Sequence, residues 1–183
     1  MKLKRFVTLP NCITMLRILS TPCLLLTMVF SRAYFVIYTL CGLSDVLDGF
    51  AARVTKQESR DGARLDSIAD LLFYTVSLLI LMPELWRRLP RGIWYPVGLV
   101  LTIRMAAYLA AALRFHCFAA VHTYLNKATS VGVFALPYFL QYSAAVPYCA
   151  ALCAVAGIAS AEELLMHMLQ REYRPDRKSL LQK

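Results

Sequence analysis

The sequence lacks several patterns that would define a soluble binding protein or a cysteine-based metal site. It has no Cys-x-x-Cys motif and no cysteine–histidine pattern with metal-ligand spacing. Most of its six cysteines lie inside apolar runs, where a thiol behaves as a small hydrophobic side chain. No stripe of alternating basic and aromatic residues and no nucleic-acid-binding motif is present, so we expect no nucleic-acid partner. Internal repeats and low-complexity segments are also missing.

What the sequence does contain is long apolar blocks. Apolar residues make up 59% of the 183 residues, and the mean hydropathy is +0.55. These values predict an all-α integral membrane protein, and residues 1–183 are expected to form a single domain. The net charge of +9 then indicates membrane orientation and contact with anionic lipid headgroups.

Six transmembrane helices are expected. Their approximate ranges are 11–30, 33–53, 63–82, 93–113, 126–142 and 147–169, with an outer loop from Pro83 to Arg91. Residues 1–9 form a juxtamembrane interfacial segment, and residues 170–183 form a basic tail. Lys and Arg are concentrated in both terminal segments and in the predicted loops on the same side of the membrane. This distribution predicts that both termini lie in the cytoplasm. The expected location is the cell (inner or plasma) membrane, with a multi-pass topology.

Four carboxylates form two pairs around the predicted turn between the second and third of these helices. Asp45 and Asp48 are i, i+3 neighbours, and Asp66 and Asp70 are i, i+4 neighbours, so each pair shares one helix face. The polar run from Thr55 to Asp61, together with Gly62, predicts the turn that brings the two faces together. Four acids this close need cations to neutralise them, and oxygen-rich sites suit Mg²⁺ or Mn²⁺.

Arg17 lies inside the first predicted helix, where a charged residue is costly. It is expected to face protein or water within the membrane, or to extend its charged end toward the headgroups.

The acids belong to a longer motif, D-x2-D-G-x2-A-R-x8-G-x3-D-x3-D. It resembles the signature of the CDP-alcohol phosphotransferase family, and every fixed position matches. The matching residues are Asp45, Asp48, Gly49, Ala52, Arg53, Gly62, Asp66 and Asp70. A segment near the start also resembles the family's P-N-x-x-T-x-x-R opening, with Pro10, Asn11, Thr14 and Arg17. The six-helix layout and the chain length are similar too, so the resemblance covers most of the chain.

The resemblance implies an integral membrane enzyme that works as a homodimer. Such enzymes transfer a substituted phosphate from a CDP-linked donor to an alcohol and release CMP. It further implies that Asp45, Asp48, Asp66 and Asp70 bind divalent metal, with Asp70 also the catalytic base. Nucleotide binding is implied for Asp48 and for the positions Gly49, Ala52, Arg53 and Gly62. Physically, small Gly49 and Ala52 leave room for a ligand, and the planar guanidinium of Arg53 suits phosphate oxygens.

Three further basic residues resemble those that border the acceptor pocket of family members: Arg104, Arg114 and Lys127. A pocket with three cations favours a phosphate-bearing acceptor. We therefore expect CDP-diacylglycerol as donor and glycerol 3-phosphate as the small alcohol acceptor, in a phosphatidylglycerophosphate synthase-like member. Met105 follows Arg104, where glycerophosphate-specific members are expected to have an acid, and this leaves serine or inositol phosphate open. Arg114 and Lys127 also fit simple anchors at the cytoplasmic surface.

Two other classes of protein also carry acidic residues on helices. Isoprenoid-type transferases also bind Mg²⁺-diphosphate with Asp-rich helices, but they predict paired DDxxD-like motifs on long soluble helices. A non-catalytic transporter or assembly protein would scatter its acids through the middle of the membrane. Here the acids cluster near one surface beside Arg53, which favours the enzyme.

Overall fold

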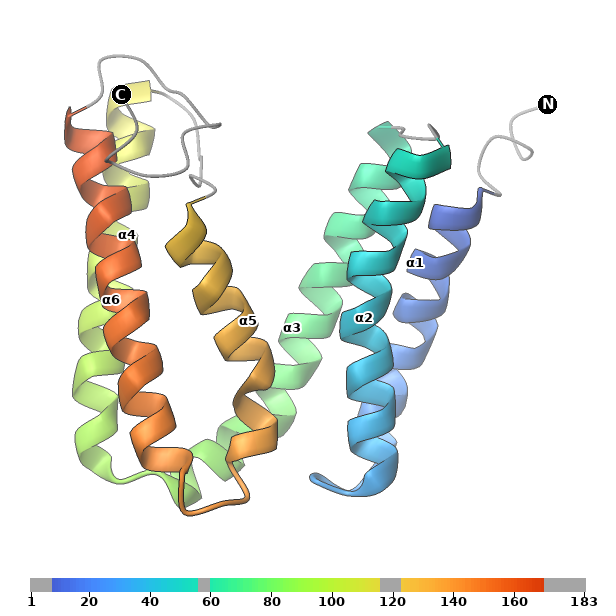
Figure 1. Ribbon diagram of the computed structural model, residues 1–183, viewed down its shortest axis with the longest axis horizontal. Helices are drawn as coiled ribbons and strands as arrows, with labels where there is room; N and C mark the ends of the chain where they lie inside the picture. Colours follow the sequence, from blue (N-terminus) through green and yellow to red (C-terminus); the bar gives the residue numbers. More distant parts are fainter. Residues whose placement is uncertain (1–7, 56–59, 116–122, 170–183) are drawn as a thin grey trace. The chain divides into compact units, whose positions relative to one another are not determined.

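The computed structural model describes residues 8–55, 60–115 and 123–169, and over these residues the chain is helical without strands (Figure 1). In chain order the elements are α1 (Leu9–Ser20), η2 (Thr21–Leu26), α2 (Arg32–Thr55), α3 (Arg60–Arg88), η3 (Arg91–Ile93), α4 (Trp94–Phe115), α5 (Tyr124–Phe139) and α6 (Ala145–Leu169). The two η elements are 3-10 helices. The all-α prediction is confirmed.

Among the described residues, four helical stretches are long and apolar enough to cross a bilayer: Arg32–Ala52, Arg64–Arg88, Arg91–Arg114 and Ala145–Met168. Large apolar side chains such as Leu71 and Leu113 are exposed on these helices, as expected of surfaces that face lipid. The chain is therefore a multi-pass membrane protein. The predicted count of six spans is not confirmed, because the apolar helix Pro10–Leu26 and α5 are shorter.

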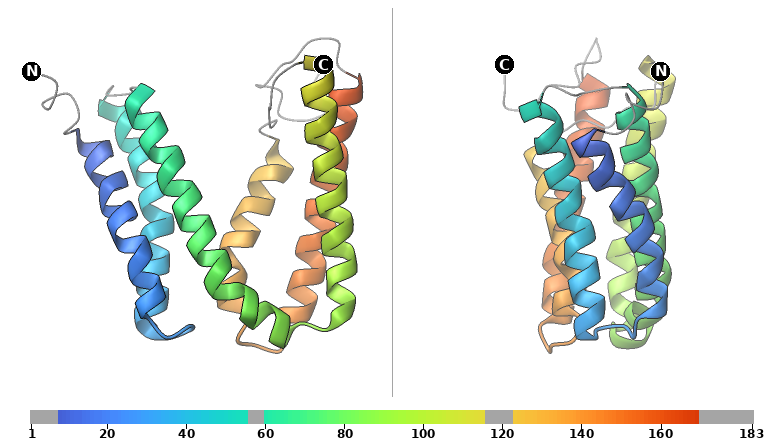
Figure 2. Two further views of the ribbon diagram at one scale, coloured as in Figure 1. Left: turned by 180° about the vertical axis from the view of Figure 1, so that it is seen from behind. Right: turned by 90° about the vertical axis from the view of Figure 1, so that its right-hand side faces the viewer.

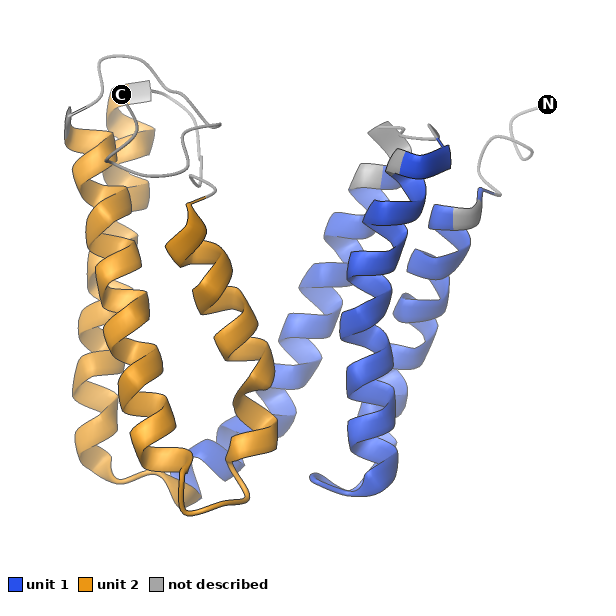
Figure 3. Cartoon of the chain, viewed as in Figure 1, with its two compact units in different colours: residues 1–87 blue, residues 88–183 orange. Residues whose placement is uncertain are grey.

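The chain forms two compact units, Met1–Arg87 and Arg88–Lys183 (Figure 3). Unit 1 contains α1, η2, α2 and nearly all of α3, and unit 2 contains η3, α4, α5 and α6. Within each unit the long helices run side by side (Figure 2).

The core of unit 1 sets the register between α2 and α3. The buried rings of Tyr34 and Tyr38 stack with centroids 5.6 Å apart, and Tyr38 contacts Phe73 of α3 at 5.2 Å. Asp45 lies seven residues after Tyr38, and Asp66 lies seven residues before Phe73. Seven residues are close to two helical turns, so in this antiparallel pair the aromatic contact places the two aspartates opposite each other.

Two predicted helix boundaries are wrong, and each involves a proline. The helix predicted over 11–30 ends as an α-helix at Ser20 and continues as η2, because Pro22 has no N–H to donate to the carbonyl of Ile18. The sequence predicts that the third helix ends before Pro83, but α3 continues to Arg88. Membrane helices tolerate a proline, which removes only one backbone donor near the end of α3.

Unit 2 is built around α6, which packs against both α4 and α5. Buried alanines, including Ala107 and Ala159, allow close packing of α4 and α6. Between α5 and α6, the Tyr148 hydroxyl donates to the Gly132 carbonyl at 2.7 Å. The rings of Phe139 and Tyr148 stack with centroids 4.1 Å apart. These contacts fix the three helices of the unit.

Candidate functional site

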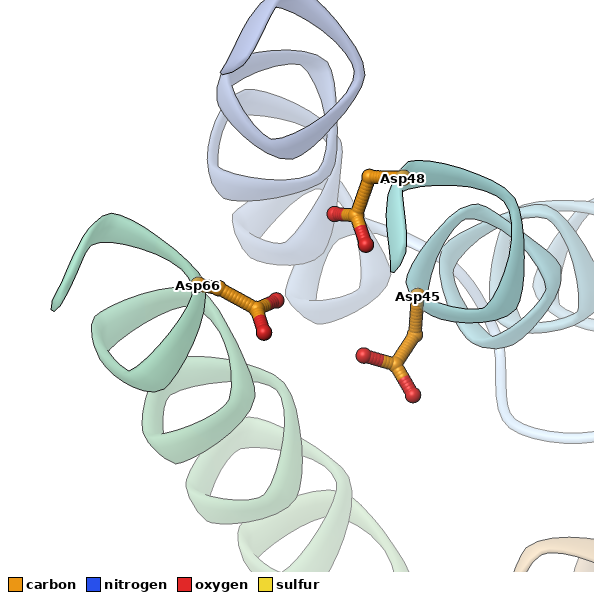
Figure 4. Close-up of side chains that lie close together, drawn as sticks. All are labelled: Asp45, Asp48 and Asp66. Atoms are coloured by element: carbon orange, nitrogen blue, oxygen red, sulfur yellow. The ribbon is translucent and has the colours of Figure 1, made fainter. Parts of the chain in front are cut away.

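The four aspartates of the motif, called here the four-aspartate cluster (Asp45, Asp48, Asp66 and Asp70), all lie in unit 1. Helix α2 carries the first two and α3 carries the other two. Figure 4 shows the carboxylates of Asp45, Asp48 and Asp66 pointing toward a common centre, and an oxygen of each lies within 4.8 Å of the others. Asp48 is buried, whereas the Asp45, Asp66 and Asp70 side chains are partly exposed.

Arg17 of α1 contacts every member of the four-aspartate cluster. Its Nη1 lies 2.7 Å from Oδ1 of Asp45 and 3.2 Å from Oδ1 of Asp70. Its Nη2 lies 3.4 Å from Oδ2 of Asp48 and also forms an ion pair with Asp66. The Arg17 side chain is only 1% exposed, so this cation is enclosed by the protein. The expectation that Arg17 faces protein is confirmed; the headgroup alternative is wrong.

Thr14 lies one turn before Arg17 on the same face of α1. Its hydroxyl lies 2.8 Å from Oδ2 of Asp48 and 3.0 Å from the carbonyl of Pro10. Asn11 is buried a further turn back, so the spacing of three aligns Asn11, Thr14 and Arg17 along one face. The opening segment that resembles the family pattern is therefore the part of α1 that supports the acids.

The other motif positions flank the acids. Gly49 and Ala52 follow Asp48 on α2, both half-buried. The predicted turn is shorter than expected: α2 runs to Thr55 and α3 begins at Arg60, so Gly62 is helical. Strong helix formers such as Arg and Ala around Gly62 account for this extension. Arg53 lies on α2, and its side chain is outside the described residues.

The chemistry of the four-aspartate cluster fits a divalent cation. Carboxylate oxygens are the ligands that Mg²⁺ and Mn²⁺ prefer. Ligands at about 2.1 Å from one cation lie up to about 4.2 Å apart, close to the 4.8 Å limit for these three acids. Four ionised carboxylates around one guanidinium leave three negative charges unbalanced. Added cations are therefore electrostatically favoured at this position.

Unit 2 holds a second polar group inside its helices, which we call the Arg104 cluster (Arg104, Asn126 and Glu163). Nη2 of Arg104 donates to Oδ1 of Asn126 at 3.0 Å and lies 3.4 Å from Oε2 of Glu163. The Asn126 amide donates to the same Glu163 oxygen at 3.1 Å. Glu163 is fully buried, and the Arg104 side chain is 25% exposed. Residue spacing does not indicate that Glu163 pairs with Arg104. The available signal is that each is a charged residue within an apolar helix and that the two charges have opposite signs.

The other two predicted acceptor residues have different surroundings. Arg114, near the end of α4, donates from Nη1 to the carbonyl of His167 at 2.9 Å and also to that of Met168. It thereby satisfies carbonyl groups at the C-terminal end of α6. Lys127 is exposed in the first turn of α5. His116 and His122, in the predicted loop between these helices, lie outside the described residues.

Comparison with known proteins agrees with these features. The chain is 35% identical over 95 residues to a Pseudomonas fluorescens protein named CDP-diacylglycerol–glycerol-3-phosphate 3-phosphatidyltransferase, covering 48% of this chain and 49% of that one. Proteins of the same name are 35% identical in Cereibacter sphaeroides (40% of this chain, 36% of the relative) and 32% identical in Wigglesworthia glossinidia brevipalpis (42% and 44%). The matches therefore span about half or less of each relative.

No solved structure matches the chain at a significant level. The sequence model of one family, described as CDP-alcohol phosphatidyltransferase, matches residues 7–169. This match includes the whole Asp45–Asp70 motif, the opening segment on α1 and the Arg104 cluster. The chain belongs to the CDP-alcohol phosphatidyltransferase family.

Proposed function

We propose that this protein transfers the phosphatidyl group of CDP-diacylglycerol to glycerol 3-phosphate and releases CMP. The observation that carries the proposal is the four-aspartate cluster, assembled from the motif residues on α2 and α3. The names of the relatives support the donor and the acceptor.

The reaction exchanges one phosphorus–oxygen bond for another. The acceptor hydroxyl oxygen bonds to the phosphorus that carries diacylglycerol, and the bond from that phosphorus to the CMP phosphate oxygen breaks. CMP leaves with the electron pair of that bond. We assign the proton of the acceptor hydroxyl to Asp70, whose partly exposed carboxylate is open to a substrate at the edge of the cluster.

We assign Asp45, Asp48, Asp66 and Asp70 to hold Mg²⁺ or Mn²⁺. When bound, such a cation would neutralise the diphosphate and the charge that develops on the leaving CMP oxygen. Thr14 orients Asp48 by a direct hydrogen bond, and Arg17 forms ion pairs with the acids.

We assign the nucleotide to the same end of α2. Half-buried Gly49 and Ala52, with Gly62 on α3, give a ligand close access to the backbone beside Asp48. Arg53 is assigned to the phosphate oxygens of the donor.

We assign the acceptor phosphate to the Arg104 cluster, with Arg114 and Lys127 as further cations. Arg104 has the strongest support, because Asn126 and Glu163 contact its guanidinium while 25% of its side chain stays exposed. Arg114 has a competing role at the end of α6. Lys127 is exposed and adjoins Asn126 in the chain.

We also propose the membrane arrangement predicted from the sequence: six spans, both termini cytoplasmic, and a homodimer. The consecutive helices α1 and η2 would together form one further membrane-crossing element, and the 16-residue α5 would form another, in addition to the four long apolar stretches. The basic tail, residues 170–183, and nearly all of the juxtamembrane segment 1–9 lie outside the described residues.

The test is an assay of CMP release by the purified protein in detergent with CDP-diacylglycerol and Mg²⁺ or Mn²⁺. Glycerol 3-phosphate, serine and inositol phosphate are supplied separately, and a reaction without acceptor serves as background. We expect release above background with glycerol 3-phosphate. CMP release with serine and not with glycerol 3-phosphate would show that the proposed acceptor is wrong. If none of the three acceptors gives release above background, while a control enzyme is active, the enzyme proposal is overturned.

The acceptor site is tested with Arg104→Ala. Loss of a cation that contacts the acceptor phosphate should raise the KM for glycerol 3-phosphate at least tenfold. Arg91→Ala is the matched control, because Arg91 is exposed on η3. An unchanged KM in Arg104→Ala would remove Arg104 from the acceptor site.

A further inference from the structure

Arg17 has surroundings that a purely structural membrane arginine does not require. It lies on the apolar helix Pro10–Leu26, and its side chain is 1% exposed. An intramembrane charge usually pairs with another charge or with backbone carbonyl groups. Arg17 instead contacts carboxylates from four residues on two other helices, through Nη1 and Nη2. Its guanidinium is thus at the electrostatic centre of the cluster.

The carboxylates that Arg17 contacts include the three that fit a divalent cation. Each carboxylate has only two oxygens, so the guanidinium and a metal ion draw on the same small set of acceptors. The two cations also repel each other, and this repulsion is weakly screened around a buried group such as Arg17. The favourable contacts of Arg17 and those of a metal ion therefore compete.

We propose that Arg17 is the built-in counter-ion of the four-aspartate cluster, and that divalent cations displace its guanidinium when they bind there. This inference rests on the metal site proposed above. Arg17 balances part of the charge of the acids when no divalent cation is bound, and it thereby keeps α1 attached to α2 and α3. The affinity of the cluster for metal is set lower than four aspartates alone would give.

Displacement predicts changes of opposite sign when Arg17 is removed. Without divalent cations the protein becomes less stable, because the acids lose their counter-ion. Metal binding becomes tighter, because the competing cation is gone. If Arg17 only oriented the acids, both stability and metal affinity would fall together. The two accounts therefore differ in the sign of one measurable quantity.

The experiment measures Mn²⁺ binding by the purified full chain in detergent, after EDTA treatment and removal of the chelator. Free Mn²⁺ is followed by electron paramagnetic resonance, and thermal unfolding is recorded with and without Mn²⁺. We expect Arg17→Gln to bind Mn²⁺ at least tenfold more tightly than the wild type. Its unfolding temperature without metal should be lower, and Mn²⁺ should raise that temperature by more than in the wild type.

Arg17→Lys gives a second measurement, since it keeps the charge but reaches fewer carboxylates. We expect its Mn²⁺ affinity to lie between those of the wild type and Arg17→Gln. If Arg17→Gln folds only with Mn²⁺ present, the cation has replaced the guanidinium, and the proposal is supported. If neither variant folds even with Mn²⁺, or if Arg17→Gln binds Mn²⁺ equally or more weakly, the proposal is overturned.

Asp66→Asn separates this inference from the function on which it rests. If Mn²⁺ binding is weakened by Asp66→Asn but is not tightened by Arg17→Gln, the metal site stands and the role of Arg17 is wrong. If the wild type does not bind Mn²⁺, or if Asp66→Asn binds it as tightly as the wild type does, the metal site itself is wrong. The proposed role of Arg17 then fails with it.

Discussion

Replacing Thr14 with valine should weaken the metal site without removing any proposed ligand. Valine has nearly the same shape as threonine but cannot donate a hydrogen bond. The Thr14 hydroxyl lies 2.8 Å from Oδ2 of Asp48, whereas Arg17 reaches the same oxygen only at 3.4 Å. Asp48 is 5% exposed, so water is poorly placed to replace the lost donor.

The size of the effect follows from that contact. A hydrogen bond to a charged group contributes about 1.5–3 kcal/mol, and about 1.4 kcal/mol corresponds to a tenfold change in an equilibrium constant. We therefore expect the Mg²⁺ concentration that gives half-maximal CMP release to rise roughly tenfold or more in Thr14→Val. The assay is CMP release at saturating CDP-diacylglycerol over a series of Mg²⁺ concentrations.

Thr129→Val is the matched control for Thr14→Val. Thr129 is also a buried helical threonine, but its hydroxyl donates to the carbonyl of Leu125 in its own helix, at 2.9 Å. Its Mg²⁺ dependence should equal that of the wild type. If Thr14→Val also has wild-type Mg²⁺ dependence, the claim that Thr14 positions Asp48 is refuted.

Two further predictions concern the stability of unit 2, measured by thermal unfolding in detergent. Glu163→Ala leaves Arg104 without its buried acidic partner, and breaking such a pair lowers the free energy of unfolding by about 3–5 kcal/mol. We expect a loss at the lower end of this range because Arg104 is partly exposed. An unchanged unfolding temperature would contradict this prediction. Tyr148→Phe removes the hydrogen bond to the Gly132 carbonyl and should cost about 1 kcal/mol. The exposed Tyr142→Phe is its control, and equal losses in the two variants would show that the bond is not the cause.

The motif acids were predictable from the sequence because their spacing is local. Asp45 with Asp48, and Asp66 with Asp70, must each share a helix face once α2 and α3 form. The short polar connection between the helices then brings the two faces to the same end. The contact between Tyr38 and Phe73 refines this by fixing the register, and no residue pattern around the acids indicates that contact.

The role of Arg17 was not predictable in the same way. Its four contacts depend on how α1 is rotated and shifted against α2 and α3, and residues 28 to 53 positions apart in the chain set that arrangement. Likewise, the position of Arg114 at the end of α6 depends on the relative lengths of two packed helices. Helix patterns specify faces, but they do not specify the axial offset between helices.

The most direct test of the central claim compares CMP release by the wild type and by Asp66→Asn, with CDP-diacylglycerol, glycerol 3-phosphate and Mg²⁺. Asparagine keeps the size of the side chain but removes the charge of one of the three acids that face a common centre. We predict acceptor-dependent CMP release by the wild type and none above background by Asp66→Asn, at a similar unfolding temperature. Near-normal release by Asp66→Asn would contradict the assignment of the four-aspartate cluster as the metal-binding site.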